Sequence, residues 1–115
     1  MNHTGSCHCG RIAFSVEGEI GTVIDCNCSI CRRRGHLLAF FPRSALTLHT
    51  PEADLATYTF NRHAIRHRFC PVCGIHPFGE DTDPAGRAMA AVNIRCLDWV
   101  DLDAVPVQHY DGLAA

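Results

Sequence analysis

The sequence contains no lysine, so all ten of its permanently charged cations are arginines. It has no apolar run approaching the roughly 20 residues of a transmembrane helix, and we expect no membrane partner. Residues 1–6 lack the basic and apolar stretches of a secretory signal peptide, which favours a cytoplasmic location. The formal net charge of −2 gives no electrostatic attraction for a polyanion, and we expect no nucleic-acid partner.

The length limits the architecture to one small domain. With 115 residues the chain falls at the lower end of the usual range of roughly 100–200 residues per domain, so we expect a single domain over residues 1–115. An apolar content of 47% is ordinary for a globular protein and argues against a disordered or collagen-like chain. The core of such a domain is modest, and a bound metal would add to its stability.

Eight cysteines are many for a chain of this length. In a secreted protein they would indicate disulfide bonds, but without a signal peptide we expect a reducing compartment, where clustered thiols bind metal. Seven of them lie in groups with the spacing of zinc ligands, namely the leading pair Cys7-x-Cys9, the triplet Cys26-x-Cys28-x-x-Cys31 and the knuckle Cys70-x-x-Cys73. The spacing therefore predicts zinc rather than disulfides.

These groups can be divided into two metal sites. The leading pair and the knuckle together would form a closed site of four thiolates, which is typical of a structural zinc. The triplet would then offer three ligands and leave one position open, as catalytic zinc sites do. Other partitions stay open, because spacing alone does not show which groups meet. The eighth thiol, Cys96, is expected to pack as a small hydrophobic residue, with a role as a fourth ligand as the alternative.

Short runs of alternating apolar residues predict an all-β domain of antiparallel strands. The clearest run places Ile12, Phe14 and Val16 on one face of a strand. Residues that favour turns, such as glycine, proline and asparagine, separate the runs. We expect strands over residues 12–16, 22–25, 36–41, 55–60, 65–69, 88–94 and 107–110, with a polar loop over residues 80–86.

Four ordered motifs carry a resemblance to a known family. They are Gly5-Ser6-Cys7-His8-Cys9-Gly10, Cys26-Asn27-Cys28-Ser29-Ile30-Cys31-Arg32, Phe69-Cys70-Pro71-Val72-Cys73-Gly74 and Val92-Asn93-Ile94-Arg95-Cys96-Leu97-Asp98. Over nearly its whole length the sequence resembles the glutathione-dependent formaldehyde-activating enzyme and centromere protein V family.

This resemblance implies a β-tent-like fold of short antiparallel sheets, stabilised by two zinc ions per chain. The structural zinc ligands of the family fall on Cys7, Cys9, Cys70 and Cys73. Its catalytic zinc ligands fall on Cys26, Cys28 and Cys31. The enzyme members of the family have carbon–sulfur lyase activity, whereas another branch is associated with chromatin and microtubules.

Three thiolates on zinc favour one kind of reaction. The site carries net negative charge and is a weak Lewis acid, but a substrate thiol is a natural fourth ligand and loses its proton on binding. Such a sulfur can add to the carbonyl carbon of a small aldehyde, and the reverse reaction breaks a carbon–sulfur bond. We therefore expect a carbon–sulfur lyase that acts on a small thiol or its aldehyde adduct, in the manner of S-hydroxymethylglutathione, with glutathione as one candidate. The alternative is a non-catalytic, zinc-stabilised binding module.

Basic and aromatic side chains near the cysteines complete the prediction. Arg32 follows the triplet directly and is the candidate catalytic residue beside the ligands, since a negative site calls for a cation or a clamp for a substrate carboxylate. The alternative for the run Arg32–Arg34 is a solvated turn. His36 and His76 could donate a proton or orient a ligand, with a purely structural histidine as the alternative. Five aromatic residues are expected in the core: Phe40, Phe41, Tyr58, Phe78 and Trp99.

Overall fold

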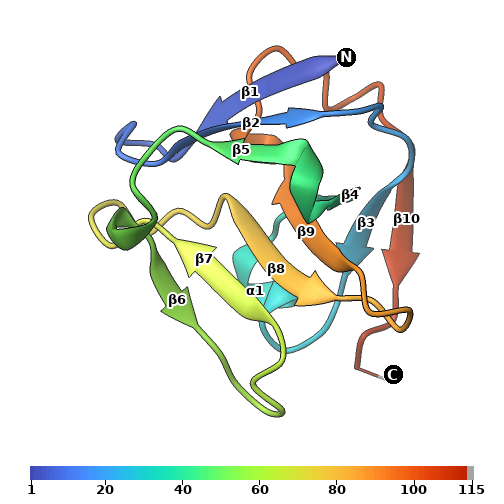
Figure 1. The fold of residues 1–115 in the computed structure, drawn as a ribbon. Coiled ribbons are helices and arrows are strands. Elements are labelled where there is room, and N and C mark those ends of the chain that lie inside the picture. Colours follow the sequence, from blue (N-terminus) through green and yellow to red (C-terminus); the bar gives the residue numbers. More distant parts are fainter. Residues whose placement is uncertain (114–115) are drawn as a thin grey trace.

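The computed structural model describes residues 1–113, which form two β-sheets with short helical segments between strands (Figure 1). The smaller sheet has the order β1-β2-β5, formed by Asn2–Ser6, Ala13–Glu17 and Leu46–Leu48. The larger sheet has the order β10-β3-β4-β9-β8-β7-β6, formed by Val107–Tyr110, Val23–Cys26, Leu38–Pro42, Ala88–Asn93, Phe78–Thr82, Arg66–Phe69 and Ala56–Tyr58. The helical segments are α1 Cys31–Arg34, η1 Arg43–Ala45, η2 Glu52–Asp54 and η3 Ile94–Cys96. The predicted all-β class is confirmed.

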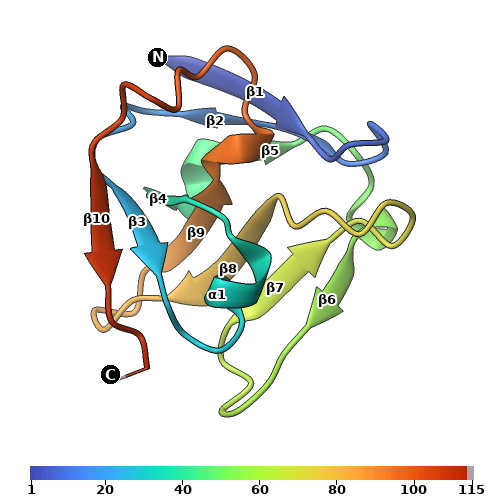
Figure 2. The same ribbon diagram turned by 180° about the vertical axis from the view of Figure 1, so that it is seen from behind.

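The core lies where the smaller sheet crosses one end of the larger one (Figures 1 and 2). Ile12, Phe14 and Val16 are buried, as their alternation predicted, because successive side chains of a strand point to opposite faces. Phe14 of β2 packs against Phe78 of β8, with ring centroids 5.7 Å apart. This contact joins the two sheets, and burial of two such aromatic rings is a large share of a core of this size.

The last strand departs from the antiparallel expectation. Strand β10 pairs with β3 in parallel, with Val107 beside Val23 and Tyr110 beside Cys26. The other strand pairs within residues 1–113 are antiparallel. Strand β10 brings the C-terminal end of the described chain alongside the turn between β3 and α1 (Figure 2). The tail of the chain thus reaches the triplet.

Several elements differ from the sequence-based prediction, among them β1, which lies where no strand was expected. The segment after the triplet forms α1, where no helix was predicted, and α1 lies against one face of the larger sheet in both views (Figures 1 and 2). The predicted polar loop over residues 80–86 is wrong at its start, because β8 continues to Thr82. Glu80 remains in the sheet, paired with Ala90 of β9, because arginines neutralise its carboxylate.

The prediction for the aromatic residues holds for two of five. Phe41 and Phe78 are buried, but Phe40, Tyr58 and Trp99 are exposed. Phe40 precedes Phe41 in β4 and therefore points to the opposite face of the sheet. Trp99 lies in a turn at a positive φ of 60° and is 99% exposed. Composition alone did not reveal which face of each strand is covered.

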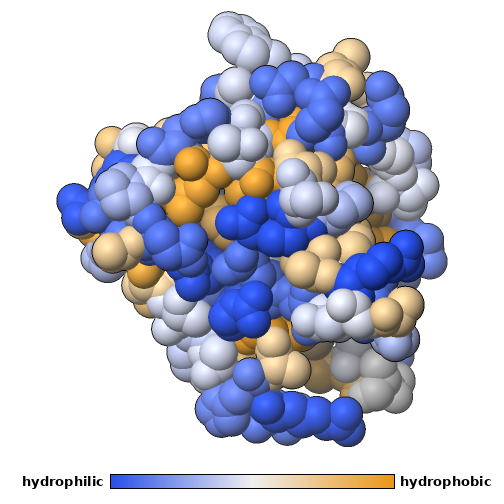
Figure 3. Space-filling view, in the orientation of Figure 1, coloured by the Kyte–Doolittle hydropathy of each residue, from blue (hydrophilic) through white to orange (hydrophobic). Residues whose placement is uncertain are grey.

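The surface is mostly polar. Hydrophilic residues cover most of the face in Figure 3, with hydrophobic residues visible in small areas between them. No helix within residues 1–113 is long and apolar enough to cross a membrane.

Candidate metal centres

The leading pair and the knuckle lie together although more than 60 residues separate them in sequence. Gly10 and Gly74 follow these groups with φ values of 83° and 81°, and both turns need a residue that tolerates positive φ. The N–H of Gly74 donates to the carbonyl oxygen of Cys70 at 2.8 Å, which closes the knuckle. The four sulfurs within 4.8 Å of one another belong to Cys7, Cys9, Cys70 and Cys73.

The spacing of these sulfurs fits a tetrahedral zinc. The Sγ atom of Cys9 lies 3.7 Å from Sγ of Cys7 and 3.7 Å from Sγ of Cys70. A tetrahedron with Zn–S bonds of about 2.3 Å places its sulfurs about 3.8 Å apart. Backbone N–H groups also face the sulfurs: Ile12 donates to Cys7 at 3.3 Å and Cys73 donates to Cys70 at 3.4 Å. Such donors stabilise thiolates, so this set suits a cation.

The triplet lies at the junction of β3 and α1. Cys26 ends β3, Cys28 lies in the turn and Cys31 begins α1, and their sulfurs lie within 4.8 Å of one another. The N–H of Cys28 donates to Sγ of Cys26 at 3.4 Å, and the N–H of Arg32 donates to the carbonyl of Cys28 at 3.0 Å. Within residues 1–113 no further cysteine, histidine or carboxylate joins this cluster. The triplet therefore offers three candidate ligands, with no fourth among residues 1–113.

Burial makes the triplet difficult to ionise without a cation. Burial, and then the neighbouring thiol of Cys28, raise the pKa of Cys31 well above the ordinary range of a thiol. Burial also opposes ionisation of Cys28, but hydrogen bonds from the backbone N–H of Cys31 and from neighbouring thiols lower its pKa overall. The surroundings favour the thiolate of Cys28, and a second thiolate would form against its charge, which a divalent cation would offset.

The triplet opens onto a cavity of about 300 Å³. Its walls are mostly apolar, with Ile24, Leu38, Phe40, Ile65 and Ala91 among them. Three buried histidines also line it: His36, His67 and His76, which we call the histidine cluster. His36 and His76 were candidates from the sequence, whereas His67 was not, because only the pairing of β7 with β8 brings it to this wall.

The arginines after the triplet face different surroundings. Arg32 and Arg33 are exposed, and the guanidinium of Arg33 donates to the carbonyl of Ser29 at 2.7 Å. Arg34 is partly buried, and its Nη1 lies 3.3 Å from Nδ1 of His67. Burial lowers the pKa of Arg34, while the Cys31 thiolate acts in the opposite direction. Arg34 is thus the arginine beside the triplet and the cavity, whereas the role of Arg32 stays a prediction.

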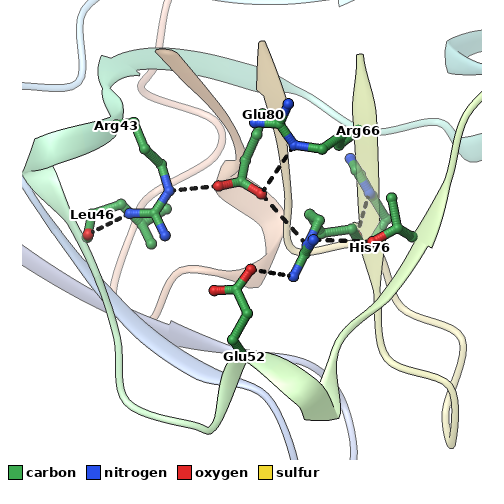
Figure 4. A network of polar contacts seen from close by, with 8 residues as sticks. Arg43, Leu46, Glu52, Arg66, His76 and Glu80 are labelled. Carbon is green, nitrogen blue, oxygen red and sulfur yellow. Dashed lines mark hydrogen bonds and ion pairs between the residues drawn. The ribbon is translucent and has the colours of Figure 1, made fainter. Parts of the chain in front are cut away.

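A network of charged residues lies next to His76 (Figure 4). Glu80 is 8% exposed and accepts a hydrogen bond from Nε of Arg43 at 2.7 Å. Arg68 lies 3.5 Å from the same carboxylate through Nε and donates through Nη2 to Glu52 at 2.7 Å. The carbonyl oxygen of Arg68 lies 2.7 Å from Nδ1 of His76. The network therefore holds the strand against which His76 is oriented.

The tail and the eighth thiol complete the surroundings. A side chain at Gly112 would meet Sγ of Cys26, and the Oδ1 of Asn27 accepts a hydrogen bond from the N–H of Leu113 at 3.2 Å. The tail therefore packs directly on the triplet, a contact that was not predicted from the sequence.

Cys96 packs against the core, and its thiol donates to the carbonyl of His76 at 3.9 Å. It belongs to neither cysteine cluster, and all eight thiols are free of disulfides.

The structure is that of a small all-β protein with two sheets and two cysteine clusters. One cluster has four thiols and the other has three, and both could bind a metal ion. A family model described as glutathione-dependent formaldehyde-activating enzyme matches residues 2–110, and the chain belongs to this family. It is also similar to a Rhodobacter sphaeroides protein whose crystal structure was determined as a structural genomics target, with 30% identity and a TM-score of 0.77. That match covers 94% of this chain and 100% of the other.

Proposed function

We propose that the chain is a zinc-dependent carbon–sulfur lyase of the formaldehyde-activating type, acting on adducts of a small thiol and a small aldehyde. The observation that carries the proposal is the triplet, which has three cysteine ligands, no fourth from residues 1–113, and a cavity in front of it. Residues 1–115 would act as one domain. Cytoplasmic thiols, glutathione among them, would be the partners, with no membrane or nucleic-acid partner.

The reaction conserves oxidation state. A bond forms between the thiol sulfur and the carbonyl carbon, and the proton released by the thiol ends on the former carbonyl oxygen; the lyase direction is the reverse. Cys26, Cys28 and Cys31 would hold the catalytic zinc, which would supply an open position at which a thiol ionises near neutral pH. Cys7, Cys9, Cys70 and Cys73 would hold a structural zinc.

The residues around the triplet would supply positive charge and an apolar cavity wall. Arg34 is the partly buried cation on the last turn of α1 and would offset the negative charge of the thiolates. The apolar wall of the cavity excludes water, which strengthens that interaction and protects the adduct from exchange with solvent. The exposed Arg32 would meet a substrate carboxylate at the mouth of the site, the role predicted from the sequence.

Two cysteine variants test this proposal against the alternative of a non-catalytic binding module. The zinc-loaded protein is assayed for formation and cleavage of S-hydroxymethyl adducts from formaldehyde with glutathione and with ethanethiol. Cys28→Ser should keep the fold and lose turnover, because it removes one ligand of the open site, whereas Cys70→Ser should unfold the chain. Turnover retained in Cys28→Ser, or wild-type protein with no turnover on either thiol, overturns the proposal. Equal melting of both variants favours the binding module.

A further inference from the structure

The histidine cluster has a hydrogen-bonding capacity that the protein itself does not use. Its three rings come from different parts of the chain, with centroids 5.3 Å apart for His36 and His76 and 6.0 Å apart for His67 and His76. They are only 4%, 7% and 6% exposed for His36, His67 and His76. Buried polar groups in proteins almost always have partners, because an unpaired one costs free energy.

Three ring nitrogens lack such a partner among the described residues. Neither Nδ1 nor Nε2 of His36 is hydrogen-bonded, although both are buried, and the same holds for Nε2 of His67. These atoms belong to residues that line the cavity in front of the triplet. Residues of the cavity wall therefore carry unpaired, buried polar atoms close to the open metal site.

The neighbours of two rings decide which nitrogen carries the proton. A carbonyl oxygen only accepts, so Nδ1 of His76 donates to Arg68 and Nε2 of His76 is left as an acceptor in the neutral ring. A guanidinium only donates, so Nδ1 of His67 accepts from Arg34 and Nε2 of His67 carries a hydrogen. The rings of His36 and His76 stay neutral, since burial is the first cause that lowers the pKa of His36 to about 4 and of His76 to about 3. The cluster thus offers a donor and an acceptor at once.

A hydroxyl group both donates and accepts, and it matches this arrangement. The remaining walls are apolar, and among the described residues that line the cavity none is an arginine, while Asp81 adds a carboxylate. A ligand portion with carboxylates of its own would find no cationic side chain among these lining residues, since Arg34 lies behind His67 and already donates to it. An uncharged portion would bury apolar surface against Ile24, Leu38 and Phe40 instead.

We propose that this cavity binds a small uncharged ligand, with its hydroxyl oxygen held by the histidine cluster and its carbon chain against the apolar wall. The inference rests on the proposed function in one respect: the hydroxyl is that of a thiol–aldehyde adduct. His67 and His76 are positioning residues for that oxygen. The portion of the adduct inside the cavity therefore carries no carboxylate, and a thiol that has carboxylates would place them outside the cavity, at its mouth.

The test uses two stable probes of the same shape, methylthioethanol and methyl propyl sulfide. The first ends in a hydroxyl group where the second ends in a methyl group. Neither has a free thiol, so binding is measured without turnover, by NMR titration of the histidine ring nitrogens in the zinc-loaded full chain. We expect roughly tenfold tighter binding of methylthioethanol, since the hydroxyl pairs atoms that the sulfide leaves unpaired. The same titration reports the Nδ1–H form of His76 and the Nε2–H form of His67.

Variants separate this role from a structural one. His67→Phe should reduce the preference for the hydroxyl probe below about threefold, whereas His67→Gln, whose amide can replace the Nε2–H donor, should retain most of it. His63→Asn, at an exposed histidine, is the matched control and should bind as the wild type does. Equal affinity of the two probes, unmoved ring signals, or an unchanged preference in a folded His67→Phe overturns the inference. If the hydroxyl preference is found but no adduct is turned over, only the proposed function fails.

Discussion

Gly112 offers the sharpest test of how the triplet is built. A Cβ atom added at this position would lie 2.7 Å from Sγ of Cys26 and 2.8 Å from Cβ of Cys28, where ordinary contacts begin at 3.4 Å. Gly112 does not require a positive φ, so Gly112→Ala acts through this clash and not through backbone strain. The clash involves the ligand residues themselves and cannot be relieved by a flexible side chain end.

The size of the effect follows from overpacking. Inserting a methyl group into a packed region costs about 1–3 kcal/mol, here through displacement of the triplet or of the tail that hydrogen-bonds to Asn27. We therefore expect the metal affinity of the triplet to fall roughly 5- to 150-fold in Gly112→Ala. The four-cysteine cluster shares no contact with Gly112 and should bind metal as before.

Competition with a chromophoric zinc chelator measures the two affinities separately. Gly21→Ala is the matched control, because no atom lies within 4 Å of its added Cβ and its backbone needs no positive φ. The control should leave both affinities unchanged. If Gly112→Ala binds two metals as tightly as the wild type, the packing of the tail on the triplet is not as described here.

Three further predictions follow from the surroundings of the site. Arg34→Gln should lower adduct turnover about tenfold, since a partly buried cation beside the thiolates is lost. Arg33→Gln, at an exposed position, should not, and equal effects of the two variants would refute the role of Arg34. Glu80→Gln should cost about 3 kcal/mol in urea denaturation, because Arg43 and Arg68 lose their buried partner, whereas an unchanged midpoint would contradict this. His36, held neutral by burial with a pKa lowered from 6.5 to about 4, contributes stability that is complete above pH 6.5 and is lost as the pH falls toward about 4. Replacement by Gln should flatten the decline of unfolding free energy in this window by up to about 1.4 kcal/mol per pH unit, and an unaltered slope would refute it.

The sequence was informative wherever a local pattern determines structure. The alternation of Ile12, Phe14 and Val16 predicted β2 and its buried face, because successive side chains of a strand point to opposite faces and this pattern shows within a few residues. The spacing of the cysteines likewise marked the leading pair, the triplet and the knuckle as groups of metal-ligand type, but which groups meet depends on the fold, which joins Cys9 to Cys70. Alternation along a strand and spacing within one cysteine group both follow from covalent geometry over a few residues, which a sequence displays directly.

Features that depend on distant contacts were beyond prediction. His67 reaches the cavity only because β7 pairs with β8, and Gly112 reaches the triplet only because β10 pairs in parallel with β3. The helix α1 has four residues, too few for a hydrophobic period, yet it determines that Arg34 rather than Arg32 turns toward His67. The cavity itself arises between strands that are far apart in the sequence.

Cadmium NMR on the protein with both clusters loaded tests most directly whether the triplet keeps an open metal position. The account predicts two resonances, of which one is unaffected by added ethanethiol and the other moves as the thiol binds. Cys28→Ser should remove or displace the resonance that responds to the thiol and leave the other in place. A single cadmium bound per chain, or two resonances that both ignore the thiol, would contradict the account.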